Sequence, residues 1–228
     1  MTAEERIVRF MIEKQGRMAS IFRFATVPSI HRETVAEHSY HVAFLTMLVG
    51  DYLKARGWHV NELKMISMAL IHDIEEVVSG DVLGPLKRGK FKEELEKLNA
   101  RGMEFLCHSL GEDAGEHYKE IWNEYRKGET IEAATVKFLD LMAILVHSVK
   151  EVHSGNRYFR ELLIAVAGEL VEYLNSLQDS EDGGDGNRYG THLQDIAQAF
   201  YDYVRRYLEG DKELLEALEV CLRVEALR

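Results

Sequence analysis

Three segments of the sequence place imidazole or carboxylate side chains among apolar residues. His38 lies in TVAEHSYHVAFL, the adjacent pair His72 and Asp73 lies in MALIHDIEEVVSGD, and Asp140 lies in TVKFLDLMAIL. A carboxylate in apolar surroundings needs a hydrogen bond, a cation or a metal ion to offset its lost hydration. These four residues are therefore the first candidates for chemistry.

The chemical types of these side chains suit a divalent metal ion. Two imidazoles and two carboxylates form a mixed nitrogen and oxygen set, which fits manganese, cobalt, nickel, iron or zinc. The absence of a thiolate from the set argues against a cysteine-rich structural zinc site. Taken singly, each histidine could instead be a hydrogen-bonded core residue, and Asp140 could cap a turn or pair with an arginine.

The elements that must position these residues are expected to be helices. Apolar residues recur at three- and four-residue spacing through most of the chain, which predicts an all-α protein. The only two prolines, Pro28 and Pro85, lie outside the long periodic segments. We expect helices over residues 4–15, 35–54, 61–78, 91–110, 113–127, 130–153, 157–178, 190–208 and 211–226, and a flexible loop rich in Gly and Asp over 179–190.

Composition and charge limit the classes of protein and partner. A chain of 228 residues can bury a sufficient core without disulfides, and Cys107 and Cys221 lack CxxC spacing. The net charge of −11 repels nucleic-acid backbones and anionic lipid, so neither is expected as a partner. The N-terminus lacks an apolar signal region, and no apolar run has the length of a membrane span. We therefore expect a soluble, cytoplasmic protein.

The order of these motifs resembles the HD-domain phosphohydrolase superfamily. The segment AEHSYHVA, followed by HDIEEVVSGDV and then KFLDLM, is similar to its 5'-deoxynucleotidase and HD-domain-containing branch. The resemblance implies that one divalent metal ion is held by His38, His72, Asp73 and Asp140.

The same resemblance implies an overall organisation. It runs from about Arg23 to Asn156, more than half of the chain. We expect an HD-domain helical bundle over residues 1–160 and a C-terminal helical extension, packed on this core, over 161–228. The resemblance also implies a homodimer.

Two carboxylates after the HD pair are candidates for catalysis. Glu76 follows Asp73 by three residues and projects from the same helix face, where it could orient or deprotonate water or protonate a leaving oxygen. Glu75 points elsewhere and is expected to be solvated. By resemblance, Asp81 lies near the substrate as a second acid or base or as a partner of a sugar hydroxyl, or it only forms the turn after Gly80.

Phosphate recognition requires cationic donors, which three residues supply or support. Arg23 occupies the family's Arg–aromatic position before the EHS helix, so the resemblance assigns Arg23 to phosphate and Phe24 to the sugar or base. The family commonly has tryptophan in place of Phe24, and the smaller ring bears on discrimination for deoxyribose. Lys87, in the GPLK loop, is a second phosphate candidate or a solvated loop lysine.

The predicted activity is hydrolysis of (deoxy)nucleoside 5'-monophosphates, a small-molecule nucleotide substrate, to nucleoside and phosphate. Related HD proteins instead remove triphosphate from nucleotides or hydrolyse cyclic nucleotides or guanosine tetraphosphate. The small domain and the GD pair favour the monophosphate. A further alternative is a non-catalytic nucleotide-binding protein on a degenerate HD fold. Such proteins usually lose a ligand, whereas all four are present here together with Glu76.

Overall fold

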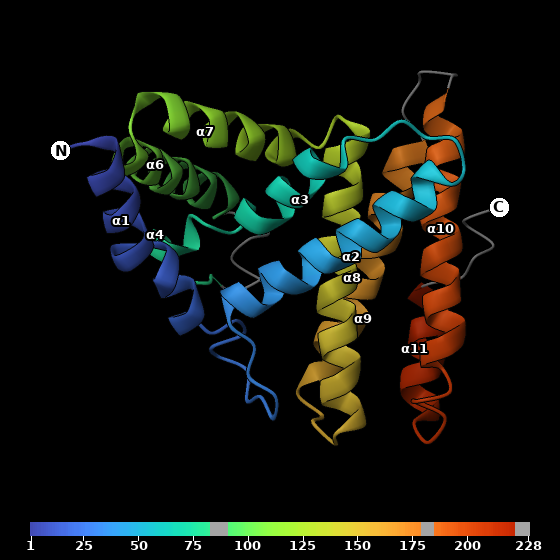
Figure 1. The fold of residues 1–228 in the computed structure, drawn as a ribbon. Coiled ribbons are helices and arrows are strands. Elements are labelled where there is room, and N and C mark those ends of the chain that lie inside the picture. The colour runs from blue at the N-terminus through green and yellow to red at the C-terminus, as the bar shows by residue number, and fades with distance from the viewer. Residues whose placement is uncertain (83–90, 179–184, 222–228) are drawn as a thin grey trace. The chain divides into compact units, whose positions relative to one another are not determined.

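The computed structural model describes residues 1–82, 91–178 and 185–221, and within these ranges every regular element is a helix (Figure 1). The prediction of an all-α fold is confirmed. Among the helices described, none combines the length and the apolar character that crossing a membrane requires. The elements are α1 (Ala3–Glu13), the 3-10 helix η1 (Gln15–Ser20), α2 (Val35–Lys54), α3 (Glu62–Ile71), α4 (Glu76–Ser79), α6 (Lys92–Leu110), α7 (Glu112–Lys127), α8 (Ile131–His153), α9 (Phe159–Gln178), α10 (Asp185–Val204) and α11 (Lys212–Cys221).

The chain forms two compact units, an N-terminal unit of Met1–Val136 and a C-terminal unit of Lys137–Arg228. In the N-terminal unit, α2 packs against α3, α3 packs against α7, and α6 packs against α7, α1 and α4. In the C-terminal unit, α9 packs against both α10 and α11. The predicted domain limits of 1–160 and 161–228 stay a prediction.

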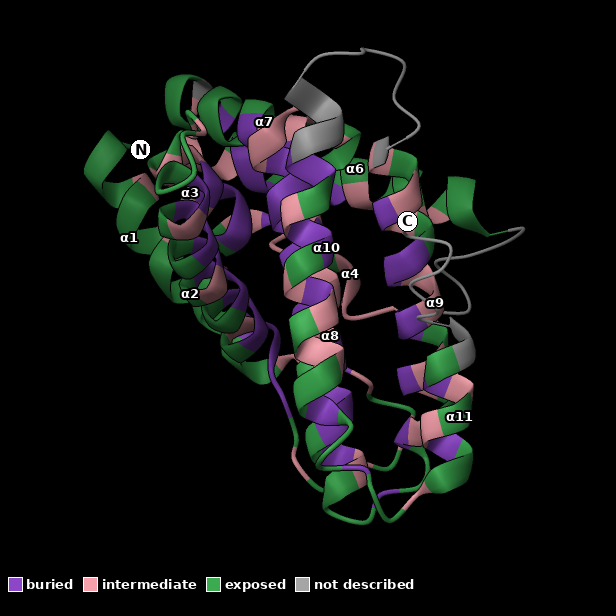
Figure 2. Cartoon of the chain, turned by 90° about the vertical axis from the view of Figure 1, so that its right-hand side faces the viewer, coloured by how far each residue is buried: buried purple, intermediate pink, exposed green. Residues whose placement is uncertain are grey.

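The start of α2 is fixed by a capping box. The Thr34 hydroxyl accepts a hydrogen bond from the Glu37 backbone N–H at 3.2 Å, and the Glu37 carboxylate accepts one from the Thr34 N–H at 2.8 Å. Buried residues of α2 then recur at helical spacing from Val35 to Leu53, and Figure 2 shows buried positions recurring along α8 and α9 as well. His38 therefore lies in the first turn of α2, on its buried side.

The HD pair lies in a turn between two helices, so the single helix predicted over 61–78 is wrong in its middle. Asn61 caps α3, as its position predicts, by accepting a hydrogen bond from the Lys64 N–H at 3.1 Å. The helix then ends at Ile71. Nδ1 of the His72 ring lies 2.8 Å from the Ala69 carbonyl oxygen. In a continuing helix this oxygen would accept the Asp73 backbone N–H. Backbone hydrogen bonds with the tighter three-residue spacing follow, and α4 begins at Glu76.

Apolar side chains on both sides of this turn anchor it in the N-terminal unit. Ile74 contacts two clusters of buried side chains, and Ile71 contacts one of them. The turn that carries His72 and Asp73 is thus attached to the apolar interior immediately before and after the pair. The first cluster contains Met18, Val35, Val77 and Leu106, and the second contains Met103, Cys107 and Trp122.

The flexible loop predicted over 179–190 is too long at its C-terminal end. Residues 179–184 lie outside the described residues, but α10 begins at Asp185 rather than at residue 190. Tyr189, Leu193 and Ala197 follow one another at four-residue spacing and are all buried. The apolar stripe of α10 therefore starts at Tyr189, inside the segment whose Gly and Asp content indicated a loop.

Candidate metal centre and substrate site

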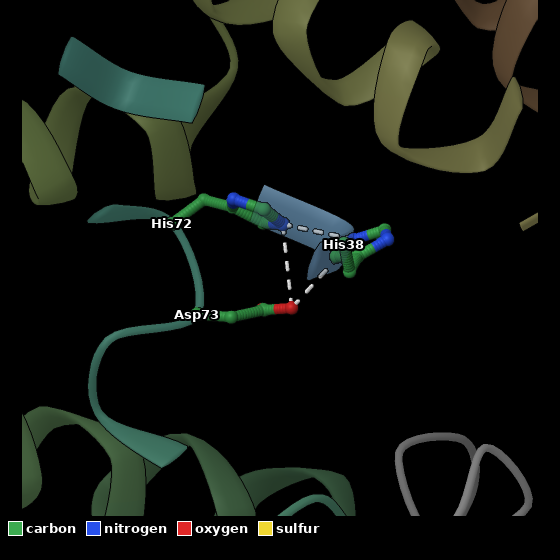
Figure 3. A group of neighbouring side chains, drawn as sticks. All are labelled: His38, His72 and Asp73. Atoms are coloured by element: carbon green, nitrogen blue, oxygen red, sulfur yellow. Dashed lines mark hydrogen bonds and ion pairs between the residues drawn. The ribbon is translucent and has the colours of Figure 1, made fainter. Parts of the chain in front are cut away.

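His38, His72 and Asp73 point toward one another, and one ligand atom from each lies within 4.8 Å of the others (Figure 3). Nε2 of His38 is 3.3 Å from Nε2 of His72 and 3.9 Å from Asp73 Oδ2. Nε2 of His72 is 3.3 Å from the same Asp73 oxygen. Both histidines are buried, whereas the Asp73 side chain retains 17 % of its exposure. The structure thus brings together three of the four metal ligands implied by the sequence.

The hydrogen bond of His72 fixes which ring nitrogen faces this cluster with a lone pair. A carbonyl oxygen only accepts, so Nδ1 of His72 carries the proton that it donates to Ala69. In the neutral ring Nε2 is then unprotonated and faces His38 and Asp73. An imidazole lone pair next to a carboxylate oxygen and a second imidazole is a donor set that fits a divalent cation of the borderline class.

Asp140, the fourth ligand implied by the sequence, lies on α8 in the C-terminal unit. The other three ligands belong to the N-terminal unit. The place of Asp140 at the cluster therefore stays a prediction.

Arg23 reaches the cluster through Asp73. Its Nη1 donates a hydrogen bond to Asp73 Oδ2 at 2.8 Å, the same oxygen that faces both histidines. Its Nε lies 3.7 Å from a Glu33 carboxylate oxygen, and the Arg23 side chain is buried. The residue assigned to phosphate by resemblance thus places a permanent cation beside the cluster, with its fork held between two carboxylates.

Glu33 is a buried carboxylate of the site that the sequence analysis missed. Its Oε2 lies 3.9 Å from Nδ1 of His38, and its Oε1 lies 3.2 Å from Nδ1 of His41. The separation from His38 exceeds hydrogen-bond length, so Glu33 places a carboxylate near this ring without a hydrogen bond to Nδ1. Glu33 stands between Arg32 and Thr34, and these polar immediate neighbours do not distinguish it from a surface residue.

Phe24 and Asp81, both assigned to the substrate region by resemblance, are in direct contact. The Phe24 backbone N–H donates a hydrogen bond to Asp81 Oδ2 at 2.9 Å. Phe24 has a φ of +56°, a left-handed conformation that costs an L residue roughly 1–2 kcal/mol. Its ring centroid lies 5.4 Å from the guanidinium carbon of Arg23. The aromatic ring is therefore next to the cation assigned to phosphate.

The two consecutive glutamates after the HD pair are both buried, which corrects the expectation that Glu75 is solvated. Glu76 begins α4, three residues after Asp73. Glu75 is 2 % exposed, and its Oε2 accepts a hydrogen bond from the Trp122 indole N–H at 3.0 Å. Burial, followed by the nearby Asp73 charge, raises the pKa of Glu75 to about 7. The expectation assumed one unbroken helix, whereas the turn at His72 redirects Glu75 toward α7.

The predicted phosphate residue Lys87 lies outside the described residues. Arg23 is thus the one predicted phosphate ligand that the described part of the chain can place. Asp81 is also among the described residues, and its carboxylate binds the Phe24 backbone N–H.

Comparison with known proteins gives one matching family and several relatives. A sequence profile described as the HD domain matches residues 16–174. A 5'-deoxynucleotidase of Vibrio vulnificus is 29 % identical over 147 residues, which are 63 % of this chain and 75 % of that protein. The HD-domain match includes the segments that carry His38, the HD pair and Asp140.

Solved structures share the fold at lower identity. An HD-domain phosphohydrolase of Listeria innocua superposes with a TM-score of 0.66 at 20 % identity, over 83 % of this chain and 99 % of that one. The HD phosphohydrolase of cyanophage S-2L, bound to dA and one catalytic Zn²⁺ ion, gives a TM-score of 0.53 at 17 % identity, over 87 % and 98 %. At these identities the likeness concerns the fold.

Proposed function

Because this chain belongs to the HD-domain family, we propose that it is a metal-dependent 5'-nucleotidase that hydrolyses (deoxy)nucleoside 5'-monophosphates to nucleoside and phosphate. The predicted resemblance to HD-domain phosphohydrolases of the 5'-deoxynucleotidase type is confirmed by the family match and by the Vibrio vulnificus relative. The observation that carries the proposal is that the Arg23 guanidinium lies 2.8 Å from Asp73. Asp73 in turn lies beside the His38 and His72 imidazoles.

We propose that His38, His72 and Asp73 hold the metal ion and that Asp140 completes the ligand set. When bound, such an ion supplies Lewis acidity and lowers the pKa of a coordinated water. Two imidazoles and carboxylate oxygens fit manganese, cobalt, nickel, iron or zinc. The zinc ion of the cyanophage enzyme supports an ion of this class without selecting one.

The remaining side chains bind the substrate and manage protons. Arg23 neutralises the phosphate, because its buried guanidinium is held rigidly beside the cluster. Glu76 accepts a proton from the attacking water or donates one to the leaving 5'-oxygen, since it is a buried carboxylate at the start of α4, three residues after Asp73. Phe24, beside Arg23, contacts the nucleoside part of the substrate.

A phosphate-release screen tests this proposal. Purified protein is assayed with ribo- and deoxynucleoside mono- and triphosphates and with guanosine tetraphosphate, with each of the five metals in turn, and Asp73→Ala serves as the control. Nucleoside and free phosphate from monophosphates, lost in the control, would support the proposal. Tripolyphosphate from triphosphates, or pyrophosphate from guanosine tetraphosphate, would replace it with another HD chemistry. Nucleotide binding without any hydrolysis would indicate a non-catalytic protein.

The cytoplasmic location and the homodimer predicted from the sequence are kept as parts of this proposal. The dimer rests on the family resemblance. Sedimentation equilibrium of the full chain, with and without metal, tests it directly: a mass near 52 kDa, twice the 26.2 kDa of one chain, supports the dimer, and the single-chain mass contradicts it.

A further inference from the structure

The Asp81 side chain holds the backbone of a loop that is distant in sequence. Its Oδ2 accepts the Phe24 N–H at 2.9 Å, across 57 positions of the chain. Among the described residues, Phe24 alone combines a side chain with a positive φ. Because that conformation is sterically disfavoured for an L residue, the surrounding contacts must select it. A charged acceptor on the amide of the same residue is such a contact.

Both residues of this hydrogen bond adjoin parts of the site: Phe24 follows Arg23, and Asp81 follows the segment that carries the HD pair. Arg23, the preceding residue, donates its backbone N–H to the Glu33 carbonyl at 2.9 Å and its guanidinium to Asp73 at 2.8 Å. Asp81 follows Gly80, which ends the short helix that begins at Glu76. The hydrogen bond therefore joins the loop of the phosphate cation to the end of the segment that carries the HD pair.

We propose that Asp81 is a positioning residue that acts through Phe24. Its carboxylate holds the left-handed backbone of Phe24, and the backbone sets where the aromatic ring lies beside Arg23. The Phe24 ring then forms the wall against which the nucleoside part of the substrate binds. The effects expected on KM and kcat rest on the proposed function, whereas the contact between Asp81 and the Phe24 backbone does not. In this proposal Asp81 transfers no proton.

Two substitutions at Asp81 separate positioning from proton transfer. Asp81→Ala removes the acceptor, so we expect KM for the nucleoside monophosphate to rise about tenfold while kcat changes less than about threefold. Asp81→Asn retains an amide oxygen that accepts the same N–H, so it should restore KM to within about threefold of the native value. A loss of kcat well beyond threefold in both Asp81→Asn and Asp81→Ala would instead identify an acid or base and overturn the proposal.

Hydrogen exchange at the Phe24 amide gives a readout that requires no catalysis. We expect Asp81→Ala to accelerate exchange of this amide by about tenfold or more in the full chain without nucleotide, and Asp81→Asn to keep most of the protection. An unchanged exchange rate in Asp81→Ala would overturn the proposal. If native protein hydrolyses no nucleotide, the proposed function fails while this measurement still decides the role of Asp81.

A double-mutant cycle with Phe24→Gly tests whether Asp81 acts through this residue. Glycine adopts a positive φ without steric cost and carries no ring. Phe24→Gly should itself raise KM, and adding Asp81→Ala to it should change KM by less than about twofold. Fully additive effects of the two substitutions would contradict an action through Phe24.

Discussion

Both units contain complementary polar pairs, but among the described residues only the N-terminal unit also gathers three cation-binding side chains at one place. In the N-terminal unit, two imidazole nitrogens and a carboxylate oxygen, all groups that bind cations, converge at separations of 3.3–3.9 Å. In the C-terminal unit, complementary groups meet. The fully buried Glu151 carboxylate accepts a hydrogen bond from the Asn156 amide, and the partly exposed Arg160 pairs with Asp211.

The two arrangements have different consequences. A complementary pair satisfies a buried group and so contributes to the stability of the fold. A convergence of cation-binding groups is costly by itself and indicates a binding site. His38 and His147 show the difference within one residue type: both are buried on long helices, but His147 packs edge-on against Phe159, with ring centroids 5.5 Å apart. Burial of a histidine is therefore a weaker indication of function than the side chains it meets.

Replacing one histidine from each unit should give the largest contrast. We expect His38→Ala to lower phosphohydrolase activity at least about 10³-fold, because it removes a metal ligand. His147→Ala, the matched control, should lose thermal stability and keep metal content and activity within about threefold. Initial rates and metal analysis of both variants check this, and equal losses of activity would remove the distinction between the units.

The consecutive glutamates provide the next contrast. Glu76→Gln should lower kcat by about 10²- to 10³-fold with metal affinity retained, because a carboxylate that transfers protons is lost. Glu75→Gln keeps an oxygen that can accept the Trp122 indole N–H, so kcat should fall less than about tenfold. Steady-state kinetics with metal titration of both variants measure this. A larger loss in Glu75→Gln would exchange the two roles.

Asp140 tests whether the site extends beyond the N-terminal unit. Asp140→Ala should weaken metal binding by about 10- to 100-fold or more, since a proposed direct ligand contributes at least as much as the groups that orient ligands. Glu151→Gln, on the same helix, is the control and should bind metal with unchanged affinity. Calorimetric titration of both variants decides the point; native affinity in Asp140→Ala would limit the ligands to the N-terminal unit.

The complementary pairs of the C-terminal unit should affect stability alone. Asn156→Ala leaves the buried Glu151 carboxylate without its amide donor, so the free energy of unfolding should fall by about 1–3 kcal/mol. Denaturant unfolding measures the loss, and the metal dissociation constant should stay at the native value. A weakened metal affinity without a change in stability would show that this pair serves the site.

The sequence predicts well what local patterns decide. The helices expected from residues 35 and 61 begin at or next to these positions, where the structure shows the short-range Thr34–Glu37 capping box and the Asn61 cap. The HD motif likewise identified residues that the fold brings together. The interruption of the helix at His72 was not predictable in this way, because it involves a ring nitrogen that bonds the Ala69 carbonyl.

Several features of the site that local patterns do not show depend on contacts made far along the chain. Glu75 is buried because Trp122, on α7, supplies a donor, and Asp81 meets the backbone of a loop that precedes it by 57 positions. Glu33 gave no signal because its neighbours in sequence are polar, and only the fold places Arg23 and His38 around it. Helix periodicity indicates which face of a helix is apolar. It does not indicate which side chain from a distant part of the sequence contacts that face.

The central claim, that the converging groups of the N-terminal unit bind a divalent ion, is tested most directly by calorimetric titration of chelator-treated protein with Mn²⁺ or Zn²⁺. We predict one ion per chain in the native protein and a dissociation constant at least about tenfold higher in His38→Ala. Binding that is absent from the native protein, or equally tight in His38→Ala, would contradict the account.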